Sequence, residues 1–443
     1  MSSLRHKQCT PWGHPCMKIR LITLLLGLAA CSPAPLPGPG PSPSTPTSSI
    51  SPTSPPSASS SPVPDLKTGN LIANPGAEIA VGSRPADWSS DSWGELKAEL
   101  SWRQDTPYSG QRYLSTRVSE YGGEGDAKWS FEPVSLRGGK WYEYRDQYRS
   151  DGRSRQIYAC QPPGGTRRFY NASQSHVNQG WHESVFRFYL PSDCDVTVMH
   201  LLDRNGFLDT DHHQLRQVDA APLNQAMVSV SFDDIWKTAY TLGASELEAR
   251  GFKGSFYITR LYTEQPGEKY ANLNDVKDLI KRGHELGSHS HRHAAMSEME
   301  QPALLEDIRK STVLLKDLGV SEIGIAYPFG DFNGSVETEV QRFHSYARTS
   351  LAGLNDKTSN RYRLRIVPVT SETSTESLLS WIQSAAETRT WLILLFHDLG
   401  EPIPQSPYTT SFTQYLEVLD ELKRREAEIK VVTVEQGLKA AGL

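Results

Sequence analysis

Apolar and polar positions alternate over short runs between residues 66 and 222. Residues 141–145 (WYEYR) and 184–188 (SVFRF) are two of these runs, and clusters of Gly, Asp, Asn and Ser separate such runs from one another. A period of two residues places successive side chains on opposite faces of a β-strand. Since no amphipathic helical pattern occurs here, we expect residues 66–222 to form an all-β domain.

The pattern changes from residue 223 to residue 443, where apolar runs alternate with helical segments. Asn274 can cap a helix that ends near Gly283, and a second helix with an apolar face ends at Gly319. This alternation predicts a parallel α/β fold, either a barrel or an open sheet. The strands are expected at residues 228–232, 255–258, 323–326, 366–369, 391–396 and 430–434.

Residues 1–31 are predicted to be a signal segment. Their apolar run, residues 21–30, is too short to cross a bilayer as a stable helix. The run ends at Cys31 in the sequence LAAC, which resembles a bacterial lipobox, and the signal begins most naturally at Met17. We therefore expect an exported protein that a lipid on Cys31 anchors to the membrane of the cell envelope. An ordinary signal peptide with a chance cysteine is the alternative.

Residues 32–65 are almost entirely Pro, Ser, Thr, Gly and Ala. Such a segment cannot bury enough apolar surface to fold, so we expect a disordered linker. Its proline content favours an extended spacer that reaches on the order of 100 Å.

Length and charge limit the classes of protein that remain. A chain of 443 residues is long enough for two globular units, and its formal charge of −5 gives no indication of a nucleic-acid partner. The β-rich half is also rich in tryptophan. Exposed Trp stacks on sugar rings, whereas buried Trp fills a core.

Two cysteines remain after the signal segment, Cys160 and Cys194. Export implies an oxidising compartment, so a disulfide between them is plausible. Two free buried thiols are the alternative.

The β-rich half opens with the sequence NLIANPGAE at residues 70–78. This opening resembles the start of jelly-roll carbohydrate-binding modules. The resemblance implies a jelly-roll sandwich that binds glycan. It also implies a structural Ca²⁺ near Glu78, because many such modules carry calcium near this acidic residue.

Two motifs in the C-terminal half carry residues that can bind a metal ion. Asp233 and Asp234 follow one predicted strand, and His289 and His293 are four residues apart. On a helical turn both imidazoles would face one way. Two His and one Asp form a triad that suits Zn²⁺ or a related divalent ion. The second carboxylate would then be available as a base.

Two further motifs follow other predicted strands. The turn at residues 326–331 (AYPFGD) can aim a backbone N–H at an oxyanion, and His397 ends an apolar strand, where it can protonate a leaving group. A glycosidase that uses Asp233 and Asp234 as its carboxylate pair is a rival interpretation. It is less suitable, because adjacent carboxylates do not flank a glycosidic bond and the His pair would have no role.

Taken in order, these motifs over residues 224–443 resemble the polysaccharide deacetylases of carbohydrate esterase family four, whose catalytic unit is the NodB homology domain. The resemblance implies a distorted (β/α) barrel and metal-dependent deacetylation of an acetylated polysaccharide. By this resemblance Asp233 is the catalytic base and His397 the catalytic acid, and the N–H of Phe329 is the oxyanion donor. The implied metal ligands are Asp234, His289 and His293.

The chain departs from the family pattern at one position. Many members have an Arg two residues before the Pro of the third motif, where it orients the base, and this position is Ala326 here. Arg365 is a candidate to replace it, and no clear version of the family's Asp–Trp motif occurs. We expect an N-acetylglucosamine polymer as the substrate, ahead of acetylated xylan. An O-acetyl xylan esterase and a non-catalytic carbohydrate-binding lipoprotein are the alternatives.

Overall fold

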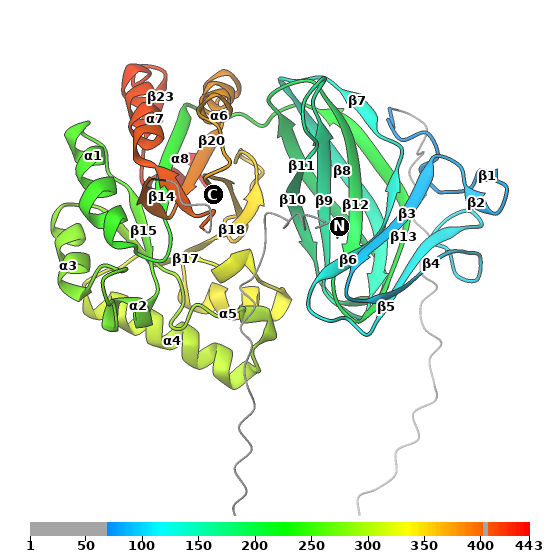
Figure 1. Ribbon diagram of the computed structural model, residues 1–443, viewed down its shortest axis with the longest axis horizontal. Coiled ribbons are helices and arrows are strands. Elements are labelled where there is room, and N and C mark those ends of the chain that lie inside the picture. The colour runs from blue at the N-terminus through cyan, green and yellow to red at the C-terminus, as the bar shows by residue number, and fades with distance from the viewer. Residues whose placement is uncertain (1–68, 402–405) are drawn as a thin grey trace, which may run out of the picture. The chain divides into compact units, whose positions relative to one another are not determined.

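The described part of the chain is residues 69–401 and 406–443, in a computed structural model (Figure 1). These residues belong to one unit, Pro64–Leu443. The predicted signal segment, Cys31 and the whole of the predicted linker lie outside the described residues.

Antiparallel strands make up the N-terminal part of the described chain. One sheet has the order β10-β9-β12-β6-β3, with β7 beside β12, and the other has the order β11-β8-β13-β5-β4. A hairpin of Ala80–Val81 (β1) and Arg84–Pro85 (β2) precedes them. The strands of the two sheets are Trp88–Gly94 (β3), Lys97–Arg103 (β4), Tyr113–Ser119 (β5), Gly125–Phe131 (β6), Val134–Leu136 (β7), Lys140–Ser150 (β8), Ser154–Gln161 (β9), Arg168–Ser175 (β10), Asn178–Leu190 (β11), Cys194–Leu202 (β12) and Gly206–Val218 (β13).

The two sheets share one core, as expected for a sandwich. Tyr142 and Tyr144 alternate along β8 with polar residues and belong to the same buried cluster as Trp129 and Phe131 from β6 of the other sheet. From β8 to β13 the chain passes repeatedly from one sheet to the other, as in a jelly roll. The period-two pattern therefore predicted this part of the fold correctly.

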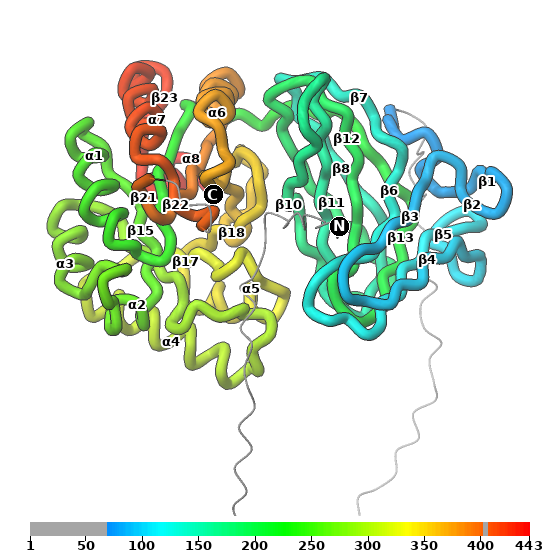
Figure 2. The backbone as a smooth tube through the Cα atoms, in the orientation of Figure 1, coloured from blue at the N-terminus to red at the C-terminus, as the bar shows by residue number. Residues whose placement is uncertain are grey.

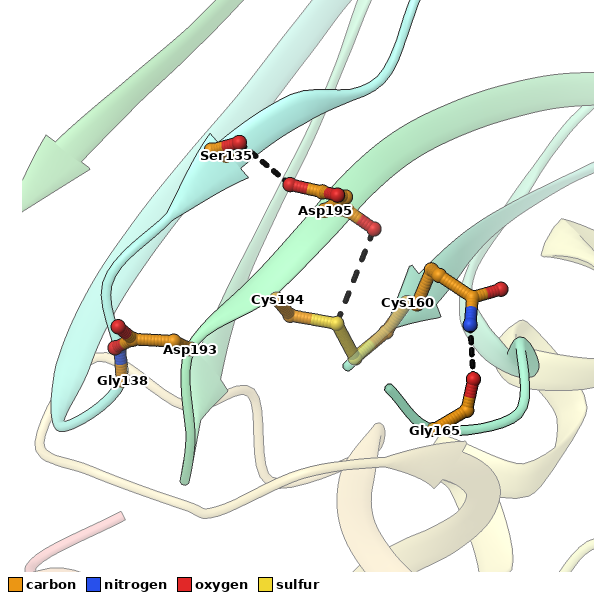
Figure 3. The surroundings of a disulfide bond; sticks show 8 residues. Ser135, Gly138, Cys160, Gly165, Asp193, Cys194 and Asp195 are labelled. Carbon is orange, nitrogen blue, oxygen red and sulfur yellow. Dashed lines mark hydrogen bonds between the residues drawn. A yellow bond between two sulfur atoms is a disulfide. The ribbon is translucent and has the colours of Figure 1, made fainter. Parts of the chain in front are cut away.

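A disulfide joins β9 to β12 within this sandwich (Figure 3). The sulfur atoms of Cys160 and Cys194 are bonded, and the two residues are 34 positions apart in the sequence. Both cysteines are buried and belong to the sandwich core. The bond therefore covalently joins two neighbouring strands of one sheet.

The carboxylate of Glu78 is engaged with the backbone of a neighbouring loop. Its Oε1 accepts hydrogen bonds from the N–H groups of Gln111 and Arg112, at 2.9 and 3.1 Å. Within the described residues, the single group of three potential metal ligands lies in the C-terminal part. A calcium ion at Glu78 stays a prediction.

The C-terminal part is a closed parallel barrel of seven strands, in the order β14 to β20, because β15 pairs with both β14 and β16. Figure 2 traces the backbone of this part, with β15, β17 and β18 labelled. A further strand, β23, adds to the outer side of β14. The barrel strands are Ala226–Phe232 (β14), Ser255–Ile258 (β15), Glu285–Ser288 (β16), Gly324–Ala326 (β17), Tyr346–Ala352 (β18), Leu364–Pro368 (β19) and Trp391–Phe396 (β20), and β23 is Ile429–Val431. The expected sandwich followed by a distorted barrel is confirmed.

Helices connect successive barrel strands, as the alternating pattern predicted, except β18 and β19, which a loop without a helix joins (Figure 1). No helix within the described residues is both long enough and apolar enough to span a membrane. Two short strands, Asp398–Gly400 (β21) and Thr409–Ser411 (β22), pair after β20. The helices are Ala239–Gly243 (η1), Ala244–Ala249 (α1), Arg260–Glu264 (α2), Leu273–Lys281 (α3), Met296–Glu298 (η2), Gln301–Asp317 (α4), Pro328–Gly330 (η3), Gly334–Phe343 (α5), Thr375–Thr388 (α6), Phe412–Arg424 (α7) and Val434–Ala441 (α8).

Some details differ from the expectations. Asn272, and not Asn274, caps α3, because the Asn272 side chain accepts the N–H groups of Asn274 and Asp275. The strands β16 and β18 were not predicted. Their sequences, ELGS and YARTSLA, contain charged and hydroxyl side chains that leave no continuous apolar run to mark a strand.

Candidate active site

The motif residues lie at the C-terminal ends of barrel strands. Asp233 follows β14, His289 follows β16, Tyr327 follows β17 and His397 follows β20. Parallel strands bring their carboxyl ends to one edge of a barrel, which is where active sites of such barrels form. The Asp233 N–H donates to the Phe396 carbonyl at 3.1 Å, which ties the first of these ends to the last.

Asp234, His289 and His293 form a cluster that can hold a metal ion. One ligand atom from each residue lies within 4.8 Å of the others. The Asp234 Oδ1 is 3.2 Å from the His293 Nε2 and 3.6 Å from the His289 Nε2. The two Nε2 atoms are 3.1 Å apart. The three donor atoms therefore converge on one point.

The donor atoms also have the protonation states that a metal requires. The His289 Nδ1 is 2.8 Å from the Ala326 carbonyl, which can only accept, so Nδ1 carries the proton and Nε2 presents its lone pair. Burial, reinforced by the neighbouring His289, lowers the pKa of His293 to about 4, so this imidazole is neutral at pH 7. The buried Asp234 Oδ1 accepts no hydrogen bond from any described residue. One carboxylate and two imidazoles suit a divalent ion such as Zn²⁺.

The loop that carries the two histidines is not the expected helical turn. Ser290 and His293 have positive φ values of 67° and 53°, so the backbone reverses direction instead of coiling. Asp307 of α4 is fully buried and accepts the N–H groups of His291 and Arg292, at 3.0 and 3.2 Å. The two imidazoles converge, as the four-residue spacing predicted. A turn held by Asp307 brings them together, and not a helix.

Asp233 lies beside the cluster and is paired with an arginine. The Asp233 Oδ2 is 3.7 Å from the His289 Nε2, and the Arg348 Nη2 donates to Oδ1 in a buried ion pair. Burial acts to raise the pKa of Asp233, but Arg348, His289 and His397 together outweigh burial and hold this pKa below its usual value. Asp233 is therefore ionised at neutral pH.

The expectation that Arg365 orients Asp233 is wrong. The Arg365 guanidinium donates to the backbone carbonyls of Ala352 and Ala172, at 3.0 and 2.9 Å. Arg348, from the middle of β18, occupies the position beside the carboxylate instead. Arg348 of β18 thus stands beside Asp233 in place of an arginine at position 326.

The turn after β17 brings Phe329 to the cluster. Phe329 has a φ of 59°, and its ring centroid lies 4.5 Å from that of His293. The next residue, Gly330, has a φ of 66°, and a Cβ there would lie 1.9 Å from the Ser350 hydroxyl oxygen. Only glycine is accommodated at this position without displacement of Ser350.

His397 is partly buried at the end of β20, and the charges of both aspartates act on it. Burial lowers the pKa of His397, although the charges of Asp234 and Asp233 act to raise it. Its Nδ1 has no hydrogen-bond partner among the described residues, and its ring centroid lies 4.9 Å from that of Tyr408. The Asp398 carboxylate accepts hydrogen bonds from the hydroxyl groups of Thr238 and Thr409, at 2.6 and 2.9 Å.

Sequence reasoning missed three residues that complete this site. Arg348 and Asp307 left a weak signal, since each places a charge within an otherwise buried strand or helix face. Trp236, whose indole N–H donates to the Asp234 Oδ2 at 3.3 Å, follows the Asp pair by two positions. Their role depends on contacts between elements, which spacing within one motif does not reveal.

Comparison with known proteins finds one family that resembles the first part of the barrel. Residues 220–347 match the family model of the polysaccharide deacetylases. Residues 220–347 are therefore similar to a polysaccharide deacetylase domain.

Individual relatives share low sequence identity with this chain. The chain is 26% identical over 244 residues to a gellan lyase from a Bacillus species, an alignment that covers 48% of this chain and 10% of the lyase. The Xyl-CE4 domain of a multidomain xylanase from the hindgut metagenome of Trinervitermes trinervoides is 16% identical, with a TM-score of 0.36 over 50% of this chain and 93% of that one. The peptidoglycan N-acetylglucosamine deacetylase Bc1960 is 17% identical, with a TM-score of 0.36 over 49% of this chain and 91% of that one.

Proposed function

We propose that this protein removes acetyl groups by hydrolysis from an N-acetylglucosamine polymer outside the cytoplasm, with one divalent metal ion, Zn²⁺ being the favoured ion. The observation that carries the proposal is the ionised Asp233, paired with Arg348, beside the convergent Asp234, His289 and His293 donors. A base next to a metal-binding cluster is the arrangement that activates water for attack on a carbonyl.

The proposed steps assign one proton transfer to each catalytic side chain. Asp233 takes the proton of the attacking water, and the new C–O bond forms as the acetyl carbonyl oxygen becomes an oxyanion. The backbone N–H of Phe329 donates to this oxyanion. His397, once protonated, gives its proton to the sugar nitrogen as the C–N bond breaks and acetate departs.

The metal ion, when bound by Asp234, His289 and His293, lowers the pKa of water and polarises the acetyl carbonyl. The chain supplies the orientation: the Ala326 carbonyl fixes the His289 ring, and Trp236 holds the second oxygen of Asp234.

The geometry argues against a glycosidase. Asp233 and Asp234 approach the same His289 nitrogen, at 3.7 and 3.6 Å, so both carboxylates lie on one side of the cluster. A glycosidase needs two carboxyl groups that face each other across the bond to be cleaved.

Acetate release from a panel of acetylated glycans tests the proposal. We expect acetate from chitin-like or peptidoglycan-like chains, without chain shortening, and loss of release after chelation with recovery on adding Zn²⁺. Release from acetylated xylan alone would assign an O-acetyl esterase. Chain shortening, or no acetate from any glycan, would overturn the proposal.

We also propose that a lipid on Cys31 anchors the protein to the cell envelope. The support is the LAAC sequence after a short apolar run, followed by a proline-rich segment. Cys31→Ser should release the protein from membranes. A wild-type protein that carries no lipid would contradict the anchor.

The sandwich is proposed to bind glycan. Its support is the module-like opening at residues 70–78 and the exposed ring of Trp93. Affinity electrophoresis of the full chain in glycan-containing gels should show retardation that Trp93→Ala reduces. Equal mobility of the two proteins with every glycan would reject Trp93 as a contact.

A further inference from the structure

The turn that carries Phe329 has an unfavourable backbone conformation. Phe329 and Gly330 have consecutive positive φ values, 59° and 66°. Side chains other than glycine rarely adopt this region, so the conformation persists only when surrounding groups hold it. Within the barrel, the Tyr327 N–H donates to the Arg348 carbonyl at 3.0 Å, which fixes the start of the turn.

Residues of the β-sandwich hold the other end of this turn. Gln174, on β10, donates from Nε2 to the Gly330 carbonyl at 3.0 Å. Arg153, between β8 and β9, forms an ion pair with Asp331, and the Arg153 Nη1 also donates to the Ser297 hydroxyl at 2.9 Å.

Ser297 joins the same set of contacts from η2. This helix follows residues 289–293, the loop of the two histidines, which we call the metal loop. The Ser297 N–H and hydroxyl donate to the two Asp331 carboxylate oxygens, at 2.7 and 2.8 Å. The side chains of Arg153 and Asp331 are only 14% and 8% exposed, so water screens their ion pair weakly. Asp331 is thus held both by the sandwich and by the chain beyond His293.

These contacts bear directly on the reacting groups. Gly330 and Asp331 are the two residues after Phe329, so their anchors limit where the Phe329 N–H points. They also limit how the Phe329 ring sits against the metal-ligand candidate His293. A displacement of about 1 Å at such a donor costs on the order of 100-fold in rate.

We propose that Gln174 and Arg153 are positioning residues for the deacetylation reaction, so that the β-sandwich supports the active site in addition to any glycan it binds. This inference rests on the proposed function for its effect on rate. Its structural part, that the two sandwich residues hold the turn, is independent of that function.

Two measurements on the full-length chain test the inference. Gln174→Leu and Arg153→Met should increase hydrogen–deuterium exchange in the peptide 327–334. They should also lower kcat by about 10-fold or more, with KM and metal content unchanged. Arg153→Lys keeps the positive charge and should restore part of the rate.

Arg187→Gln is the matched control, because Arg187 belongs to the same sandwich and its hydrogen bond to the Thr358 hydroxyl, at 3.2 Å, does not involve the turn. It should change neither exchange in 327–334 nor kcat. Unchanged exchange in both test variants would overturn the inference. A kcat in both test variants equal to that of an active wild type would also overturn the inference. If the wild type releases no acetate while exchange responds as expected, the proposed function fails and the structural part of the inference stands.

Discussion

At the scale of single residues, the ion pair with Arg348 controls the ionisation of Asp233, the proposed base. A carboxylate takes a proton only when it is ionised, so activity should fall as the pH drops through the Asp233 pKa. Burial raises this pKa, and the charge of Arg348 lowers it. Arg348 therefore sets the acidic limit of activity.

Replacement of Arg348 should move that limit. Arg348→Gln removes the largest effect that opposes burial, so the acidic limb of the kcat/KM profile should shift to higher pH by about one unit or more. Arg365→Gln should leave the limb in place, because Arg365 binds backbone carbonyls. A limb that moves in the Arg365 variant, and not in the Arg348 variant, would reverse the assignment.

The sequence predicts the residues of the site as far as each motif is contiguous. Asp233, Asp234, His289 and His293 stand out because short-range spacing and strand ends indicate their chemistry. Arg348 does not, because its role depends on the pairing of β18 with β17, which brings it round the barrel to Asp233. A charge in a buried strand was its only local signal.

At the scale of secondary-structure elements, α4 fixes the metal loop through Asp307. This buried carboxylate accepts two backbone N–H groups of the loop and the Arg292 Nε, at 3.1 Å. Groups that orient metal ligands typically contribute 10-fold to 100-fold to affinity.

Asp307→Asn should therefore weaken zinc binding by about 10-fold to 100-fold, since an amide cannot accept all three donors. Competition with a chromophoric chelator measures this affinity. Asp317→Asn, an exposed carboxylate on the same helix, is the control and should bind zinc as the wild type does. Equal affinity in both variants would show that α4 does not organise the loop.

The elements with a strong apolar period were predictable, and the polar ones were not. The runs at 391–396 and 228–232 correspond to the buried strands β20 and β14. The loop between β16 and η2 was mistaken for a helical turn, because a four-residue His spacing fits a helix as well as a turn with two positive φ values. Spacing alone does not distinguish the two backbones.

At the scale of the whole molecule, buried histidines link stability to pH. Burial lowers the pKa of His213 in the sandwich and of His344 in the barrel to about 4. The unfolded chain takes up these protons near pH 6.5, whereas the folded chain does so only near pH 4. Their contribution to stability is therefore complete above pH 6.5 and is lost as the pH falls through 4.

The free energy of unfolding should accordingly fall between pH 6.5 and pH 4, by on the order of 3 kcal/mol for each histidine. His344→Leu should flatten this decrease in urea unfolding measured across that range. His182→Gln changes an exposed histidine and should leave the slope unaltered. A His344 variant with the wild-type slope would contradict the linkage.

The account depends most on the separate roles of two adjacent carboxylates. Asp234 points its Oδ1 at both histidines, while Asp233 is paired with Arg348. The most direct test measures bound metal and acetate release together in Asp233→Asn and Asp234→Asn. We predict that Asp233→Asn keeps the metal and loses activity by about 100-fold or more, whereas Asp234→Asn loses both. Loss of metal from the Asp233 variant with retention in the Asp234 variant would contradict this assignment.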